Sequence, residues 1–154
     1  MKKSVIILLV FIPLFALGQV QIARVDSLYA AFKQVRESSA LLEPDVKTGE
    51  LVFIAPDSIR WEYTENRSFR LPDPMLRMIR QAVEGDEKKL QNAFLTEWEN
   101  ETLTLTPKQN KVKRFFSRIQ ILFTPDGVAR QVILYDPNGD KTSIIFSNIR
   151  YKRL

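Results

Sequence analysis

The pattern of apolar and polar positions divides the first half of the chain into segments of helical and of strand-like spacing. Over residues 22–35 apolar side chains recur every three or four positions, which predicts a helix with one apolar face. Residues 38–48 are expected to form a loop. Residues 49–55 and 59–63 have the alternation of strands and are separated by a proline turn, so they should form a hairpin with one solvated face.

The next segment returns to helical spacing and carries clear start and stop signals. Asp73 and Pro74 suit the N-cap and the first helical position, and Gly85 suits the end of the same helix. Asp86 is expected to cap a second, short helix that runs through Leu90. The sequence therefore predicts two consecutive helices in the middle of the chain.

From Phe94 onward the pattern is that of an antiparallel meander. Gly127 follows a proline and an aspartate in a predicted tight turn, and the Asn138-Gly139 pair is a strong hairpin signal. The expected strands are residues 102–106, 112–123, 128–136 and 141–151.

Together these elements predict an α+β fold. Each strand has one apolar face, and such a sheet of roughly seven or eight antiparallel strands usually curves or closes to protect its edges. We therefore expect a curved antiparallel sheet or unclosed β-barrel, with helices covering its concave face. Residues 19–154 should form this one domain.

The N-terminus has the features of a secretory signal peptide. Lys2 and Lys3 precede an apolar run over residues 5–17, and the small residue Gly18 follows it. Cleavage after residue 18 would release an exported protein, and periplasmic localisation is expected. The formal charge would fall from +5 to +3, because the two lysines go with the signal peptide. This mild excess does not favour a nucleic acid partner.

Composition narrows the possible chemistry. The chain of 154 residues contains no histidine and no cysteine. It therefore lacks the residues for a Ser-His-Asp triad, a typical structural zinc site or a disulfide framework. We expect no catalytic residues, no metal site and no cofactor, and hence a protein that is not an enzyme.

Several segments resemble a known family in their order along the chain. Residues 49–63 read GELVFIAPDSIRWEY and follow a predicted helix that ends near residues 32–34. Downstream, residues 103–107, 119–123 and 136–148 look like the closing strands of that family. This arrangement resembles the periplasmic outer-membrane lipoprotein carrier family (LolA-like). The match covers most of the chain after the signal peptide.

The resemblance implies a function and partners. Members of that family hold the acyl chains of a lipoprotein in an unclosed barrel lidded by helices. An inner-membrane release complex and an outer-membrane acceptor would be the protein partners, and we expect a monomer. This chain is shorter after the strand at 59–63, and it has Ala55 where the well-known carriers have an arginine that ties the barrel to its lid.

The apolar side chains of the strands and helices are the candidates for lining a lipid cavity. They are Phe32, Leu51, Phe53, Trp61, Tyr63, Met75, Leu76, Ile79, Leu103, Leu105, Ile119, Ile121, Phe123, Val132, Leu134, Ile144 and Phe146. The pattern alone favours an ordinary packed core, and only the resemblance favours a cavity.

Three hypotheses for the function follow. The first is a carrier of lipoprotein acyl chains, and the second is a carrier of another amphiphile such as a glycolipid. The third is an envelope protein-interaction or sensory module with the same fold. In the third case the face that carries Phe53 and Trp61 would be filled by the protein's own side chains.

Overall fold

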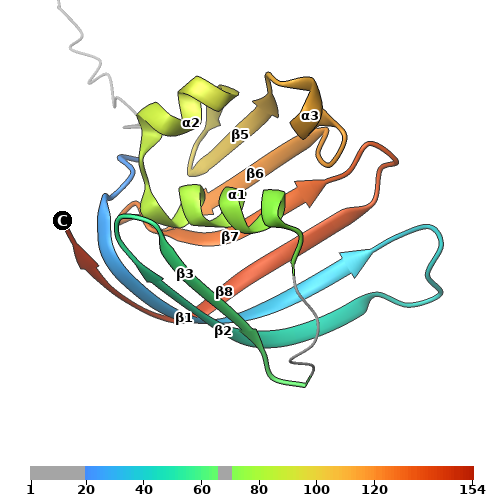
Figure 1. Ribbon diagram of the computed structural model, residues 1–154, viewed down its shortest axis with the longest axis horizontal. Coiled ribbons are helices and arrows are strands. Elements are labelled where there is room, and N and C mark those ends of the chain that lie inside the picture. The colour runs from blue at the N-terminus through green and yellow to red at the C-terminus, as the bar shows by residue number, and fades with distance from the viewer. Residues whose placement is uncertain (1–19, 66–70) are drawn as a thin grey trace, which may run out of the picture.

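The computed structural model describes residues 20–65 and 71–154, and the expected signal peptide lies outside them. One sheet of eight strands has the order β3-β2-β1-β8-β7-β6-β5-β4, with every neighbouring pair antiparallel (Figure 1). The strands are β1 (Val25–Glu37), β2 (Asp45–Ile54), β3 (Ser58–Tyr63), β4 (Phe94–Glu99), β5 (Thr102–Pro107), β6 (Arg118–Phe123), β7 (Ala129–Tyr135) and β8 (Lys141–Arg153). The helices are α1 (Asp73–Glu84), α2 (Glu87–Ala93) and α3 (Asn110–Lys113).

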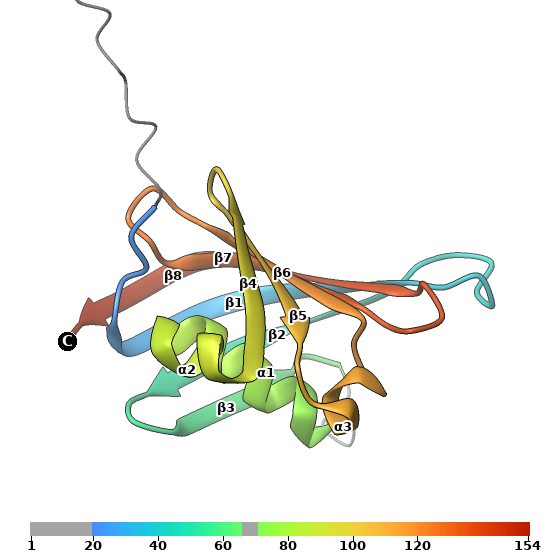
Figure 2. The ribbon, with the colours of Figure 1, turned by 90° about the horizontal axis from the view of Figure 1, so that it is seen from above.

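The sheet is curved and does not close. Strands β3 and β4 form its two edges, and helices α1 and α2 lie on its concave side (Figure 2). The pairing of β1 with β8 joins the first and last strands along most of their length. The predicted α+β class, with a curved antiparallel sheet covered by helices, is confirmed.

The helix expected over residues 22–35 is wrong, because most of that segment forms strand β1. Leu28 and Phe32 face the concave side, where they are buried, whereas Tyr29 and Val35 lie on the outer face. Apolar residues on both faces of a strand produce the three- and four-residue spacing of a helix. Hydrogen bonding to β2 on one side and β8 on the other decides for the strand.

The long strand expected over residues 112–123 is also wrong in its first half. Residues 110–113 form α3, and β6 starts only at Arg118. Phe116 is buried, while its neighbour Phe115 is 46% exposed. The chain turns between the helix and the strand here, which the alternating pattern alone did not indicate.

The two consecutive helices and their caps are confirmed with small shifts. Helix α1 has its N-cap at Pro72, one residue before the expected Asp73, and it ends at Gly85 with a left-handed φ of 74°. The Asp86 side chain caps α2 by accepting a hydrogen bond of 3.3 Å from the Lys89 backbone N–H. The turns at Gly127 and Gly139 have the expected positive φ.

Candidate functional site

The side chains that the sequence predicted to line a lipid cavity lie on the concave side of the sheet. All seventeen belong to one apolar cluster or pack against it, and only Trp61, Met75 and Leu76 are partly exposed. They come from seven strands and from α1, which lies across the sheet. In the described state they fill the interior by packing on one another.

A group of aromatic side chains from β1 and β3 packs at one side of the cluster. The rings of Phe32 and Trp61 stack with centroids 3.8 Å apart, and Tyr63 meets Phe32 edge-on at 5.4 Å. Gly49 on β2 makes room for this group, because a Cβ there would lie 2.5 Å from Cζ of Phe32. This requirement explains the glycine inside a strand, where it otherwise weakens pairing.

One buried polar pair lies beside the aromatic group. The Tyr63 hydroxyl donates a hydrogen bond of 2.7 Å to Oε1 of Gln34, and both side chains are buried. Burial raises the pKa of Tyr63 above its usual value, while the hydrogen bond with Gln34 opposes that shift. Gln34 also lines the pocket described next, so the pair joins the aromatic group to that pocket.

A pocket of about 400 Å³ opens between α1, the segment after α3, and strands β1, β7 and β8. Its volume lies within the range of about 300–1,000 Å³ typical of small-molecule sites. The apolar part of its wall is formed by Leu71, Pro72, Met75, Phe115, Phe116, Leu134 and Pro137. The polar part includes Gln34, Arg36, Arg114, Asp136, Asn138, Asp140 and Thr142.

Only two of the predicted lining residues, Met75 and Leu134, reach this pocket. Sequence reasoning missed Phe116 and Arg114, because it placed both in a regular strand. The adjacent pair Phe115-Phe116 was an available signal, since two consecutive residues of a strand cannot both face the core. The pocket therefore lies at one end of the predicted site, with the packed interior behind it.

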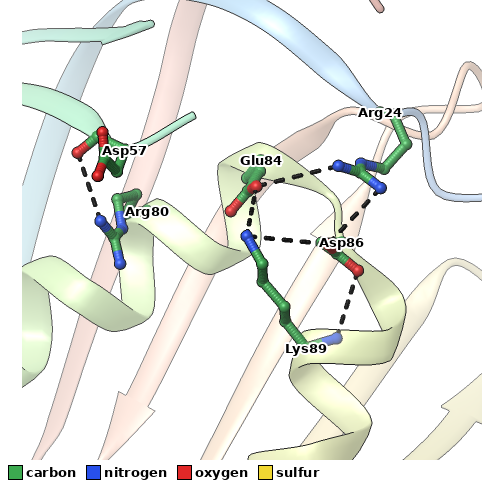
Figure 3. A network of polar contacts seen from close by, with 6 residues as sticks. All are labelled: Arg24, Asp57, Arg80, Glu84, Asp86 and Lys89. Carbon is green, nitrogen blue, oxygen red and sulfur yellow. Dashed lines mark hydrogen bonds and ion pairs between the residues drawn. The ribbon is translucent and has the colours of Figure 1, made fainter. Parts of the chain in front are cut away.

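Helix α1 is attached to the β2–β3 hairpin by an arginine of the helix itself. The Arg80 guanidinium donates a hydrogen bond of 3.3 Å to the backbone carbonyl of Asp57 in the hairpin turn (Figure 3). The hairpin position that resembles the arginine of the known carriers holds Ala55, whose backbone N–H donates to the carbonyl of Asp26. Helix α1 thus contacts the hairpin turn through Arg80.

The corner between α1 and α2 is attached to the segment that precedes β1. The Glu84 carboxylate, only 4% exposed, lies 2.8 Å from Nζ of Lys89 and 4.0 Å from the Arg24 guanidinium, which is 3.6 Å from Asp86 (Figure 3). Gly85 lies so close to the carbonyl of Ala23 that a Cβ would approach it to 2.2 Å. Helix α1 is therefore held near its C-terminal end, at the hairpin turn and at the corner, by Arg80 and Glu84 one helical turn apart (Figure 3).

Within residues 20–65 and 71–154, no three His, Cys, Asp or Glu side chains are grouped so that they could hold a metal ion. None of the helices in the described part of the chain is long and apolar enough to cross a bilayer.

Fold and pocket together define the class: an unclosed antiparallel barrel with helices, and a pocket, on its concave side. The model of the family described as outer membrane lipoprotein carrier protein LolA matches residues 75–154, slightly more than half of the chain. The protein belongs to this family, which confirms the resemblance found in the sequence. No curated protein matches the chain.

Solved structures that resemble the protein have low sequence identity. A LolA superfamily protein from Nitrosomonas europaea shares 8% identity, with 87% of this chain and 90% of that chain covered and a TM-score of 0.43. A putative outer membrane lipoprotein-sorting protein domain from Vibrio parahaemolyticus shares 10% identity, with 82% and 85% covered and a TM-score of 0.39. A DUF1329 family protein from Desulfovibrio piger shares 13% identity, with 83% and 86% covered and a TM-score of 0.34.

Proposed function

We propose that the protein is a non-enzymatic periplasmic carrier that binds the acyl chains of lipoproteins between its curved sheet and helices α1 and α2. The observation that carries the proposal is the unclosed sheet with an apolar concave face and a pocket of about 400 Å³ at one end. Membership of the LolA family supports it. An inner-membrane release complex would supply the lipoprotein, and an outer-membrane acceptor would receive it.

The energetics of binding follow from the same geometry. Each buried CH₂ is worth about 0.8 kcal/mol, so about ten methylenes gain about 8 kcal/mol on leaving water. The pocket has room for the first part of a chain, and the rest would enter where α1 now packs. Helix α1 contributes Met78, Ile79, Ala82 and Val83 to the interior, and an acyl chain would replace these contacts as the helix moves outward.

Lipid capture by the purified protein tests this proposal. Protein isolated from its native envelope should carry lipoprotein or acyl chains detectable by mass spectrometry. Stripped protein should take up a fluorescent acyl probe and unfold at a higher temperature in its presence, because a ligand that binds only the folded state stabilises it. The Met75→Trp variant fills the pocket and should bind less probe. The control Leu95→Trp changes an exposed strand position and should bind as much probe as the wild type. The proposal fails if neither lipid nor probe is found.

The nature of the co-purifying molecule separates the first two hypotheses. Acylated protein in the mass spectrum would support lipoprotein transport. A glycolipid or another amphiphile in its place would assign the same pocket to a different cargo.

The stacked Phe32 and Trp61 rings favour a second candidate function, an envelope protein-interaction or sensory module. They fill the Phe53 side of the interior with the protein's own side chains, as that hypothesis requires. In this case α1 stays in place, and its amide hydrogen exchange should be the same with and without the acyl probe. Faster exchange of α1 in the presence of the probe would support the carrier instead.

A further inference from the structure

Two adjacent exposed leucines lie at the tip of the β1–β2 loop, and one of them, Leu42, is the most exposed large apolar residue in the described part of the chain. Leu42 is fully exposed, and its neighbour Leu41 is 42% exposed. Strands β1 and β2 pair as far as Arg36 and Asp45, so the loop extends beyond the last paired residues. In both views this loop projects from one end of the sheet, away from the helices (Figures 1 and 2).

The base of the loop is joined to the neighbouring turn by ion pairs. Within the loop, the Leu41 backbone N–H donates a hydrogen bond of 3.1 Å to the carbonyl of Ser38. At the base, Arg36 pairs with Asp140 at 3.5 Å and Glu37 pairs with Lys141 at 2.6 Å. These ion pairs connect the loop to the β7–β8 turn, so the two leucines are held outward on a defined support.

The same end of the sheet carries one wall of the pocket. Arg36, Asp140 and Asn138 line the pocket and belong to the base of the loop and to the β7–β8 turn. A surface that contacts the two leucines therefore lies at the end of the sheet where these residues line the pocket.

We propose that the β1–β2 loop docks the protein on a zwitterionic lipid bilayer by inserting Leu41 and Leu42 below the headgroups. This docking goes beyond the binding of a cargo, because it assigns a surface outside the pocket and a lipid membrane as its partner. Exposed leucines at a projecting tip match a bilayer, which accepts apolar side chains at any position. The docked protein would bring the pocket wall at Arg36, Asn138 and Asp140 toward the membrane.

Size and charge favour a zwitterionic bilayer over other occupants. Each partner in a standard protein complex buries about 800 Å², and two leucines on a narrow loop offer far less. Glu43 is the one charged residue between Ser38 and Pro44, and the cations at the base are paired with carboxylates. The tip therefore has no cationic cluster of the kind that binds anionic lipid headgroups.

Vesicle flotation tests the proposal. The full exported protein should float with vesicles of phosphatidylcholine and phosphatidylethanolamine, and high salt should leave the bound fraction unchanged. The double variant Leu41→Ser/Leu42→Ser should partition at least tenfold less. The control Leu95→Ser changes a leucine that is 61% exposed on β4, away from the loop, and should bind like the wild type.

Four results of the flotation experiment would overturn the proposal. They are absence of wild-type binding, equal binding of the double variant, an equal loss in the control, and binding that needs anionic lipid and disappears at high salt. Self-association of the wild type that the double variant loses, without vesicle binding, would assign the loop to a protein contact and also overturn it.

A soluble acyl probe separates this proposal from the carrier function. The double variant should take up the probe as the wild type does, because Leu41 and Leu42 do not line the pocket. Leucine-dependent vesicle binding without probe uptake would support docking and contradict the carrier. Probe uptake without vesicle binding would do the reverse.

Discussion

Gly49 offers the sharpest test of how the interior is packed. In the Gly49→Ala variant the added Cβ would lie 2.0 Å from the carbonyl oxygen of Glu62 on β3 and 2.5 Å from Cζ of Phe32. The first contact is with backbone of the paired strand, so relief requires β2 and β3 to separate locally. The second moves the Phe32 ring off Trp61.

The size of the effect follows from these two contacts. Overpacking of a well-packed core costs about 1–3 kcal/mol, and we expect the upper end, about 3 kcal/mol, because a backbone atom cannot rotate away. The control Gly139→Ala meets no atom within 4 Å and has only its φ of 90° to accommodate. It should cost about 1–2 kcal/mol, the usual cost of left-handed backbone for an L-residue.

Urea unfolding of the wild type and the two variants measures both values, and near-ultraviolet circular dichroism reports the Phe32–Trp61 stack. Gly49→Ala should lose stability and alter the aromatic signal, whereas Gly139→Ala should lose less stability and keep the signal. A Gly49→Ala variant within 0.5 kcal/mol of the wild type, or with an unchanged aromatic spectrum, would refute the argument that Gly49 is needed for this packing.

Three further predictions concern polar contacts, two of helix α1 and one between strands β1 and β3. Arg80→Ala removes the hydrogen bond to the Asp57 carbonyl and should cost about 0.5–1.5 kcal/mol; amide exchange of α1 should quicken, and unchanged exchange would contradict the attachment. Tyr63→Phe leaves the buried Gln34 carbonyl without its hydroxyl donor and should cost about 1–3 kcal/mol, measured by urea unfolding. The pKa of Tyr63 is raised in the folded state. The contribution of Tyr63 to stability is therefore full below a pH of about 10 and is lost as the pH rises through the folded-state pKa. In alkaline buffer Tyr63→Phe should accordingly lose less stability than the wild type. Glu84→Gln removes the negative charge at the buried corner while keeping its size, and it should lower the melting temperature and its dependence on salt; an unchanged melting temperature would show that the ion pairs there contribute nothing.

Local signals determined much of the fold in advance. Pro74, Gly85 and Asp86 act on backbone geometry within a few residues, so they predicted α1, α2 and the corner between them. The hairpin at Asn138-Gly139 follows from the positive φ that its turn requires. Such signals need no knowledge of the rest of the chain.

Strand β1 shows where local reasoning fails. Its apolar residues suit a helix as well as a strand, and nothing within residues 22–35 distinguishes the two. The decision rests on hydrogen bonds with β2, about twenty residues away along the chain, and with β8 at its other end. Only long-range pairing supplies that free energy.

Some features of the candidate site likewise follow from the local sequence, and others only from the tertiary structure. The sequence by itself determined which side chains are apolar and which face of each strand carries them, because strand alternation is a local property. Tertiary structure alone decided that these side chains pack on one another, that a pocket remains beside Met75 and Leu134, and that Leu41 and Leu42 project beyond it. Those features depend on the curvature of the sheet and the placement of α1, which arise from contacts between residues far apart in the chain.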